Sequence, residues 1–150
     1  MTEIDRKSQE ILRILVQKGR ISNIELAEKV GLSASACLRR VQDLEKRGVI
    51  TGYKARLGRD ALGRGFVAYL GVGLSQHNRA AQKRFEAAMA DADEVVECHN
   101  TTGTIEYLLR VECSDLKAYK AFHTDVLGVV ADVAAITTYV VLGSPKDMRD

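Results

Sequence analysis

The chain has 150 residues, 46% of them hydrophobic and 28% charged, a composition typical of one or two folded domains with a core of their own. Its formal net charge is only +2, and no apolar run approaches the roughly 20 residues that span a bilayer, which argues against a membrane protein. The charged first residues and the odd number of cysteines, three, predict a cytoplasmic protein without a disulfide framework.

The charge is distributed unevenly along the chain. Residues 1–64 hold 14 Lys and Arg against 8 Asp and Glu, whereas residues 65–150 hold 8 against 12. A basic first part joined to an acidic second part predicts that the first part meets a polyanion such as DNA. The alternative at this point is surface charge that has no partner at all.

The first part begins with two predicted helices. Apolar residues recur at helical spacing over residues 4–18, and Gly19 follows as a helix end. Ser22 and Glu25 have the spacing of a capping box, in which each side chain accepts a backbone N–H of the other residue. Gly31 suits the left-handed residue that ends this second helix.

A third helix follows after a tight turn. Ser33 can cap it, and Gly48 follows its last residues. Residues 49–57 then alternate enough between apolar and polar side chains to predict a short strand, or wing. We therefore expect a winged helix-turn-helix domain over residues 1–57.

The third helix has two opposite faces. At about 100° per residue, an apolar stripe that we expect to be buried lies on one side and comprises Cys37, Leu38, Val41 and Leu44. The other side carries hydroxyl, guanidinium, amide and ammonium groups, which can read base edges in a major groove and neutralise phosphates. The predicted DNA contacts are Ser33, Ser35, Arg39, Arg40, Gln42, Lys46 and Arg47, with Arg40 and Arg47 nearer the phosphate backbone.

The second part changes in pattern after a linker over residues 58–64. Strand-like and helical segments alternate in the order βαββαβ, with strands over 66–74, 94–100, 105–113 and 134–143 and helices over 78–92 and from Ser114 to Gly128. This order is typical of a ferredoxin-like domain, here over residues 65–150. The fold class is therefore predicted to be α+β.

One face of this predicted sheet lacks a cover. Two helices cover a single face of a four-stranded sheet, and the other face carries Val67, Tyr69, Tyr139 and Val141. Such an apolar face is too large to leave in water, so we expect a second copy of the chain on it. The alternative is that the linker or the first domain folds back over the face.

The residues resemble the Lrp/AsnC family of feast/famine regulators. SNIELAEKVGLSASACLRRVQDLEKRG, residues 22–48, is similar to the DNA-binding signature of that family, and the likeness continues through Glu97-Cys98-His99, Tyr107-Leu108-Leu109 and Thr138-Tyr139-Val140-Val141. The resemblance implies a transcription regulator of the nucleoid with a carboxyl-terminal domain of the RAM type. It also implies dimers that assemble into octamers and control by a small molecule, usually an amino acid.

The resemblance also implies which residues hold that molecule, in a pocket that we expect at a contact between dimers. They are Asn100, Thr102, Gly103, Thr104 and Glu106, with Tyr139, Val140 and Val141 of the last strand nearby. The family loop commonly reads Gly-Asp-x-Asp-Tyr, whereas this chain has Gly103-Thr104-Ile105-Glu106-Tyr107. Because Thr104 carries no charge, we expect a neutral amino acid, with Glu106 facing its ammonium group.

Three other functions compete with this hypothesis. An enzyme is disfavoured because neighbouring Cys98 and His99 point to opposite faces of a strand, and the sequence shows no Cys-x-x-Cys motif, no phosphate-cradling glycine loop and no Ser/His/Asp arrangement. We therefore predict no enzyme, no metal site and no cofactor. An effector-sensing module that no longer binds DNA and an effector-independent, chromatin-like DNA-binding protein remain the alternatives.

Overall fold

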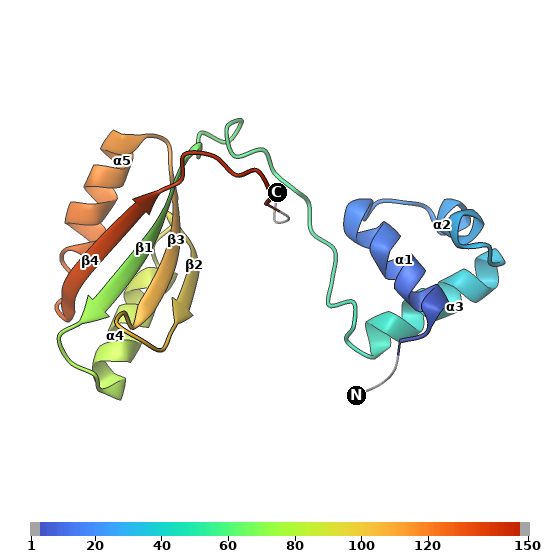
Figure 1. Cartoon of the computed structure of the whole chain (residues 1–150), viewed down its shortest axis with the longest axis horizontal. Helices are drawn as coiled ribbons and strands as arrows, with labels where there is room; N and C mark the ends of the chain where they lie inside the picture. The colour runs from blue at the N-terminus through green and yellow to red at the C-terminus, as the bar shows by residue number, and fades with distance from the viewer. Residues whose placement is uncertain (1–3, 148–150) are drawn as a thin grey trace. The chain divides into compact units, whose positions relative to one another are not determined.

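The protein, described by a computed structural model over residues 4–147, divides into two compact units (Figure 1). The first unit is Met1–Ala55 and the second is Arg56–Asp150. Each has a hydrophobic core of its own. The first consists of helices, and the second combines a sheet with helices, so the α+β class is confirmed.

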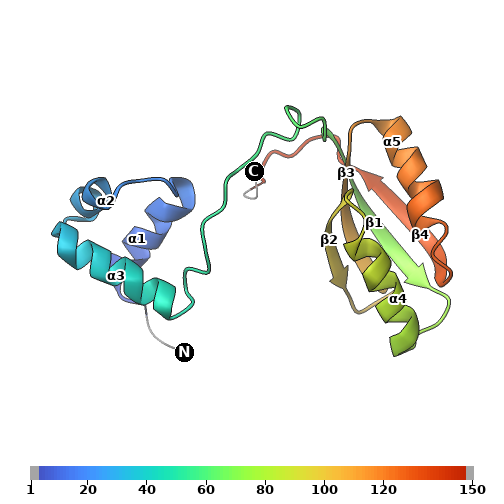
Figure 2. The ribbon, with the colours of Figure 1, turned by 180° about the vertical axis from the view of Figure 1, so that it is seen from behind.

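The first unit contains three helices, α1 (Arg6–Gln17), α2 (Asn23–Val30) and α3 (Ala34–Lys46), which pack around one another in Figure 2. Their core comprises Ile11, Leu26, Ala27, Val30, Cys37 and Leu44, all 3% exposed or less. Leu38 is 45% exposed, so its predicted burial is wrong. It lies about 100° around α3 from Cys37, at the edge of the apolar stripe, beyond the reach of this small core.

The helix ends follow the predicted capping residues. Ser22 Oγ accepts the Glu25 N–H at 3.2 Å, and Ser33 Oγ accepts the Ala36 N–H at 3.2 Å. Gly31 has φ 65°, in the left-handed region where glycine meets no steric penalty. The capping box itself is only half formed, because the Glu25 carboxylate pairs with Lys18 Nζ at 2.8 Å.

The predicted wing strand is not present. Residues 49–57 all lie in the described part of the chain and contain no strand. A strand needs a neighbouring extended segment for its backbone hydrogen bonds, and the first unit otherwise consists of helices.

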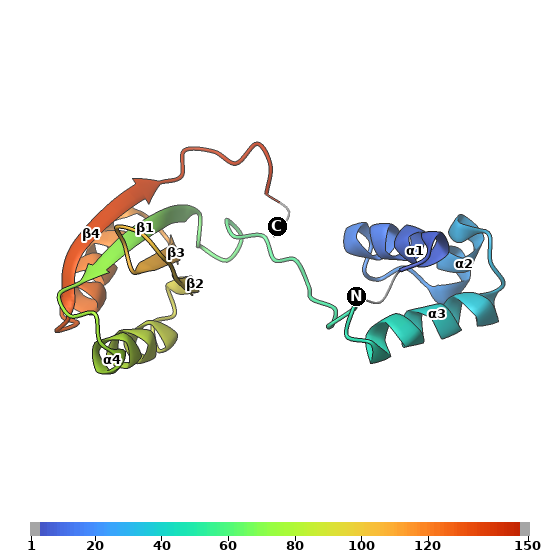
Figure 3. The same cartoon turned by 60° about the horizontal axis from the view of Figure 1, so that its bottom comes forward.

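The second unit is a four-stranded antiparallel sheet with helices on one face. Its elements are β1 (Phe66–Leu74), α4 (Arg79–Ala90), β2 (Val95–Asn100), β3 (Tyr107–Cys113), α5 (Leu116–Ala121), the π-helical turn η1 (Phe122–Leu127) and β4 (Val133–Val140). The strand order is β2-β3-β1-β4, and Figure 3 shows α4 and α5 on the same side of the sheet. The βαββαβ prediction is confirmed.

The register assigns every strand residue to a face of the sheet. Leu70 pairs with Leu109 and Thr138 on the helix-covered side, where all but Thr138 are fully buried. Tyr69 pairs with Arg110 and Tyr139 on the opposite side, which we call the open face.

The open face is partly covered by its own chain. Val67 is 8% exposed, and it lines one cavity together with Val141 and residues 57–60 of the linker. Tyr139 on the same face is 62% exposed. The linker therefore covers one end of the open face and leaves the edge formed by β4 accessible.

Candidate nucleic-acid interface and ligand site

The turn between α2 and α3 is held by backbone and side-chain hydrogen bonds. The Leu32 N–H donates to the Ala27 carbonyl at 3.0 Å, which closes α2. Asn23 Nδ2 donates to the Ala34 carbonyl at 2.8 Å and so joins the first turn of α2 to the first turn of α3. Ser33, one of the predicted contact residues, is occupied as the cap of α3 and lies 3.3 Å from the Ser35 hydroxyl.

The outer face of α3 is chemically available. Ser35, Arg39, Gln42 and Lys46 are all exposed on it. Within the described residues, the last three make no side-chain hydrogen bond or ion pair. A guanidinium, an amide and an ammonium thus project from one helix face without an internal partner, and these groups suit base edges and phosphates in a major groove.

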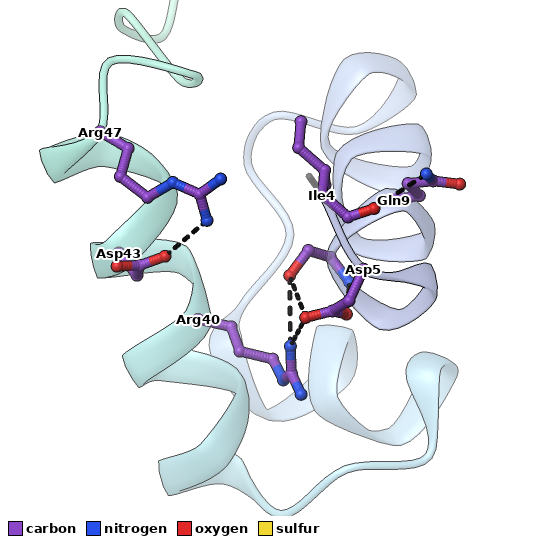
Figure 4. A network of polar contacts seen from close by, with 7 residues as sticks. Ile4, Asp5, Gln9, Arg40, Asp43 and Arg47 are labelled. Carbon is purple, nitrogen blue, oxygen red and sulfur yellow. Dashed lines mark hydrogen bonds and ion pairs between the residues drawn. The ribbon is translucent and has the colours of Figure 1, made fainter. Parts of the chain in front are cut away.

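The two flanking arginines are engaged within the unit (Figure 4). Arg40 Nη1 lies 2.5 Å from Asp5 Oδ2 and 3.2 Å from the Ser8 hydroxyl, both at the start of α1. Arg47 Nη1 lies 2.9 Å from Asp43 Oδ2, one turn away on α3. The sequence analysis predicted neither pairing, although the i,i+4 spacing of Asp43 and Arg47 is a signal for the second.

The segment between β2 and β3 forms a compact turn. The Thr101 N–H donates to the Glu106 carbonyl at 2.8 Å, and the Thr101 hydroxyl donates to the Ile105 carbonyl at 2.9 Å. Gly103 has φ 124°, which favours glycine there. Thr102, Gly103 and Thr104 are exposed at the tip of this turn.

The Glu106 carboxylate already has two partners in the chain. Its Oε2 accepts the Leu74 N–H at 2.9 Å, and its Oε1 lies 2.5 Å from His77 Nδ1. The Glu106 side chain is only 19% exposed, whereas that of His77 is 74% exposed. Sequence reasoning missed His77, because the residue is 29 positions away and no spacing rule connects the two.

Two glycines of β1 accommodate this turn. A Cβ at Gly71 would lie 3.0 Å from Ile105 Cδ1, and a Cβ at Gly73 would lie 3.5 Å from Glu106 Oε2. The turn therefore rests on the open face where β1 has no side chains. This close approach explains the alternation of glycines with buried apolar residues along β1.

The predicted ligand residues do not form one site within a chain. The Glu106 carboxylate lies beside Gly73, which pairs with Ala135, whereas Tyr139 pairs with Tyr69, four residues along β1. Four residues of strand correspond to about 13 Å. The segment Tyr139 to Val141 therefore lies toward the other end of β4 from Glu106.

Asn100 and Val140 lie on the helix-covered side of the sheet and not on the open face. Asn100 pairs with Tyr107, which is buried among the helices and donates its hydroxyl to Glu86 at 2.7 Å. Burial, followed by the Glu86 hydrogen bond, raises the pKa of Tyr107 to about 12. Val140 pairs with Ala68, a residue of the helix-covered side. Glu106, Tyr139 and Val141 remain on the open face.

In the part of the chain that the structure describes, no group of three His, Cys, Asp or Glu side chains is arranged to hold a metal ion. None of its helices is both long enough and apolar enough to cross a bilayer.

Two family descriptions match the chain in the same order as its two units. A winged helix-turn-helix DNA-binding domain matches residues 4–51, and an Lrp/AsnC ligand-binding domain matches residues 67–150. The two matches thus agree with the order of a helix-turn-helix unit followed by a sheet unit. The matched segments together leave only residues 1–3 and 52–66 outside them.

Curated relatives are similar over nearly their whole lengths. The Bkd operon transcriptional regulator of Pseudomonas aeruginosa is 41% identical over 96% of this chain and 94% of its own. A leucine-responsive regulatory protein of Rhizobium meliloti is 39% identical over 97% of this chain and 93% of its own.

Solved structures agree with the fold. A transcriptional regulator from Neisseria meningitidis in complex with L-Met has a TM-score of 0.91 at 32% identity and covers 97% of this chain and 94% of its own. A feast or famine regulatory protein from M. tuberculosis complexed with L-methionine has a TM-score of 0.82 at 28% identity, over 99% and 98%. With the exposed basic face of α3 and the βαββαβ unit, these matches show that the chain belongs to the Lrp/AsnC family of ligand-modulated, DNA-binding transcriptional regulators.

Proposed function

We propose that α3 enters the major groove of double-stranded DNA and reads a specific site through Ser35, Arg39, Gln42 and Lys46. The observation that carries this proposal is the face of α3 itself, where Arg39, Gln42 and Lys46 are exposed and have no partner among the described residues. Arg47, paired with Asp43 at the end of α3, is a phosphate contact after this pair opens. The regulator acts by binding in the cytoplasm, at the nucleoid, and not by catalysis.

The test uses a duplex selected from a random pool by the wild-type protein. Arg39→Ala should weaken binding to this duplex by about 1–3 kcal/mol, because the guanidinium reads a base. Lys46→Ala should weaken selected and random duplexes alike and lower the salt slope by about 0.9, because the ammonium meets a phosphate. Fluorescence anisotropy over a salt series measures both quantities. Wild-type affinity in both folded variants would contradict the assignment.

The sheet unit assembles copies of the chain and takes an effector. A dimer through the open face presents two recognition helices to a roughly twofold-symmetric site, and dimers assemble further into an octamer. The exposure of the Tyr139 ring on the open face supports this proposal, because association would remove the ring from water.

The effector is a neutral amino acid bound at a contact between copies. The separation of Glu106 and Tyr139 along β4 within a chain supports a site to which two copies contribute. The two solved relatives that hold L-methionine make this amino acid the first probe. A thermal-shift screen against the twenty amino acids tests the proposal, since a ligand that binds only the folded state raises the melting temperature.

One observation favours effector-independent DNA binding as the second candidate function. Both oxygens of Glu106 are engaged, by the Leu74 N–H and by His77, so the group expected to bind the ammonium is already occupied. No thermal shift with any amino acid, together with sequence-selective DNA binding, would support this second candidate. Equal affinity for all duplexes would indicate a chromatin-like role.

A further inference from the structure

Arg40 differs from the other basic residues of α3. Its side chain is 35% exposed, and its partners come from another helix of the same unit (Figure 4). At about 100° per residue, Arg40 points 100–160° away from the directions of Arg39, Gln42 and Lys46. A phosphate contact at this flank of α3 would require Arg40 to leave its partners.

The partners of Arg40 form the start of α1. Asp5 is the cap of this helix, and its Oδ1 accepts the Ser8 N–H at 3.0 Å. Its Oδ2 accepts from Arg40 Nη1, which also donates to the Ser8 hydroxyl at 3.2 Å. Ser8 is only 5% exposed. One carboxylate therefore both begins α1 and holds α3, which lies 35 residues later in the chain.

We propose that Arg40 is a positioning residue, which locks α3 to the start of α1 and so sets the angle at which the reading face meets DNA. The inference rests on the proposal that α3 reads the groove. Charge-assisted hydrogen bonds from a guanidinium have directional geometry, so this joint fixes orientation better than apolar contacts alone. DNA affinity then depends on Arg40, although its guanidinium contacts no phosphate and so releases no counterion from the DNA.

The two roles of Arg40 predict opposite effects at Asp5. If Arg40 is a positioning residue, then removing the Asp5 charge loosens α3 and weakens DNA binding. If Arg40 contacts a phosphate, then Asp5 competes with DNA for the guanidinium, and its removal tightens binding. Asp5→Asn is the suitable variant, because asparagine remains a good helix cap.

The experiment measures anisotropy with the selected duplex for full-length Asp5→Asn, Glu10→Gln and Arg40→Ala over a salt series. Glu10→Gln is the matched control, because it removes one negative charge from α1 at a residue that, among residues 4–147, pairs only with Arg6 and Lys7. We expect Asp5→Asn to bind about two- to fivefold more weakly than Glu10→Gln. We also expect Arg40→Ala to bind more weakly with an unchanged salt slope, and the double variant to be no weaker than its weaker parent.

Three results would overturn this inference. They are equal or tighter binding by Asp5→Asn than by Glu10→Gln, a salt slope lowered by about 0.9 in Arg40→Ala, or additive losses in the double variant. The Arg39 and Lys46 variants separate this outcome from failure of the proposed reading face, since only the latter leaves them at wild-type affinity. If Arg40→Ala does not fold, the Asp5→Asn comparison still decides.

Discussion

The two units differ in how complete their candidate functional sites are within a single chain. The helical unit closes its core with six buried residues and directs Arg39, Gln42 and Lys46 outward on one helix. The sheet unit buries one face fully and the other only in part, and it leaves the groups expected to meet a ligand at different ends of β4 and on different faces. The proposed groove-reading helix thus depends only on correct caps and a small core, whereas the proposed ligand site depends on a further copy of the chain.

The largest predicted effect tests whether the two cores are separate. Leu44→Ala and Leu109→Ala each remove a fully buried side chain, one from each unit, and should cost about 2–5 kcal/mol of the unfolding free energy of that unit. Urea unfolding followed by site-specific probes should show one transition shifted and the other unchanged in each variant. A common shift of both transitions in either variant would mean that the units unfold as one.

A charge on the open face should break association. Tyr69→Glu places a carboxylate between the copies and should raise the dissociation constant more than a hundredfold, from a burial cost of about 3 kcal/mol or more. Light scattering at micromolar concentration measures the change. Leu116→Glu is the control, because Leu116 is 64% exposed on the helix-covered side. Equal masses for the two variants would show that the copies associate elsewhere.

A smaller effect is expected where the turn rests on β1. Gly71→Ala brings a methyl group to 3.0 Å from Ile105 Cδ1 and should cost about 1–3 kcal/mol through overpacking. Gly143→Ala is the control, since a Cβ there meets nothing within 4 Å. Thermal unfolding compares them, and equal melting temperatures would mean that the turn moves aside at no cost.

The smallest expected effect is on how the stability of the helical unit depends on pH. The pKa of Asp5 is lowered from its ordinary value of 3.8 by the Ser8 N–H hydrogen bond and then by Arg40. A lowered pKa in the folded state gives stability that is present above pH 3.8 and is lost as the pH falls below this value. The helical unit of Asp5→Asn should therefore lose less stability than the wild type between pH 5 and pH 3, as measured by circular dichroism. An identical loss would assign no stabilising role to the Asp5 carboxylate.

The sequence predicted well the features that depend on neighbouring residues. Ser22, Ser33 and Gly31 act through atoms within a few positions, so the bounds of α2 and α3 followed from their order. Alternation along β1 likewise assigned Leu70 to the core and Tyr69 to the open face. These rules need no knowledge of the rest of the fold.

The features that the sequence did not reveal depend on distant residues. Arg40 pairs with Asp5, which is 35 positions away, and Glu106 pairs with His77, which is 29 positions away. Neither contact therefore has a spacing signature in the sequence. Leu38 was predicted to be buried because it lies on the apolar stripe of α3, but the small core does not extend to its side chain. The strand predicted over residues 49–57 had a suitable pattern and no neighbouring strand in its unit.

The most direct test of a ligand site completed by another copy mixes subunits. Glu106→Ala and Tyr139→Ala chains each lack one of its groups, so neither pure oligomer should bind L-methionine, or the amino acid with the largest thermal shift, as the wild type does. If the groups come from different copies, then refolding an equal mixture should restore wild-type binding in about a quarter of the sites, which calorimetry detects. If calorimetry of the mixture shows no recovery over the pure variants, each site lies within one chain and the account is contradicted.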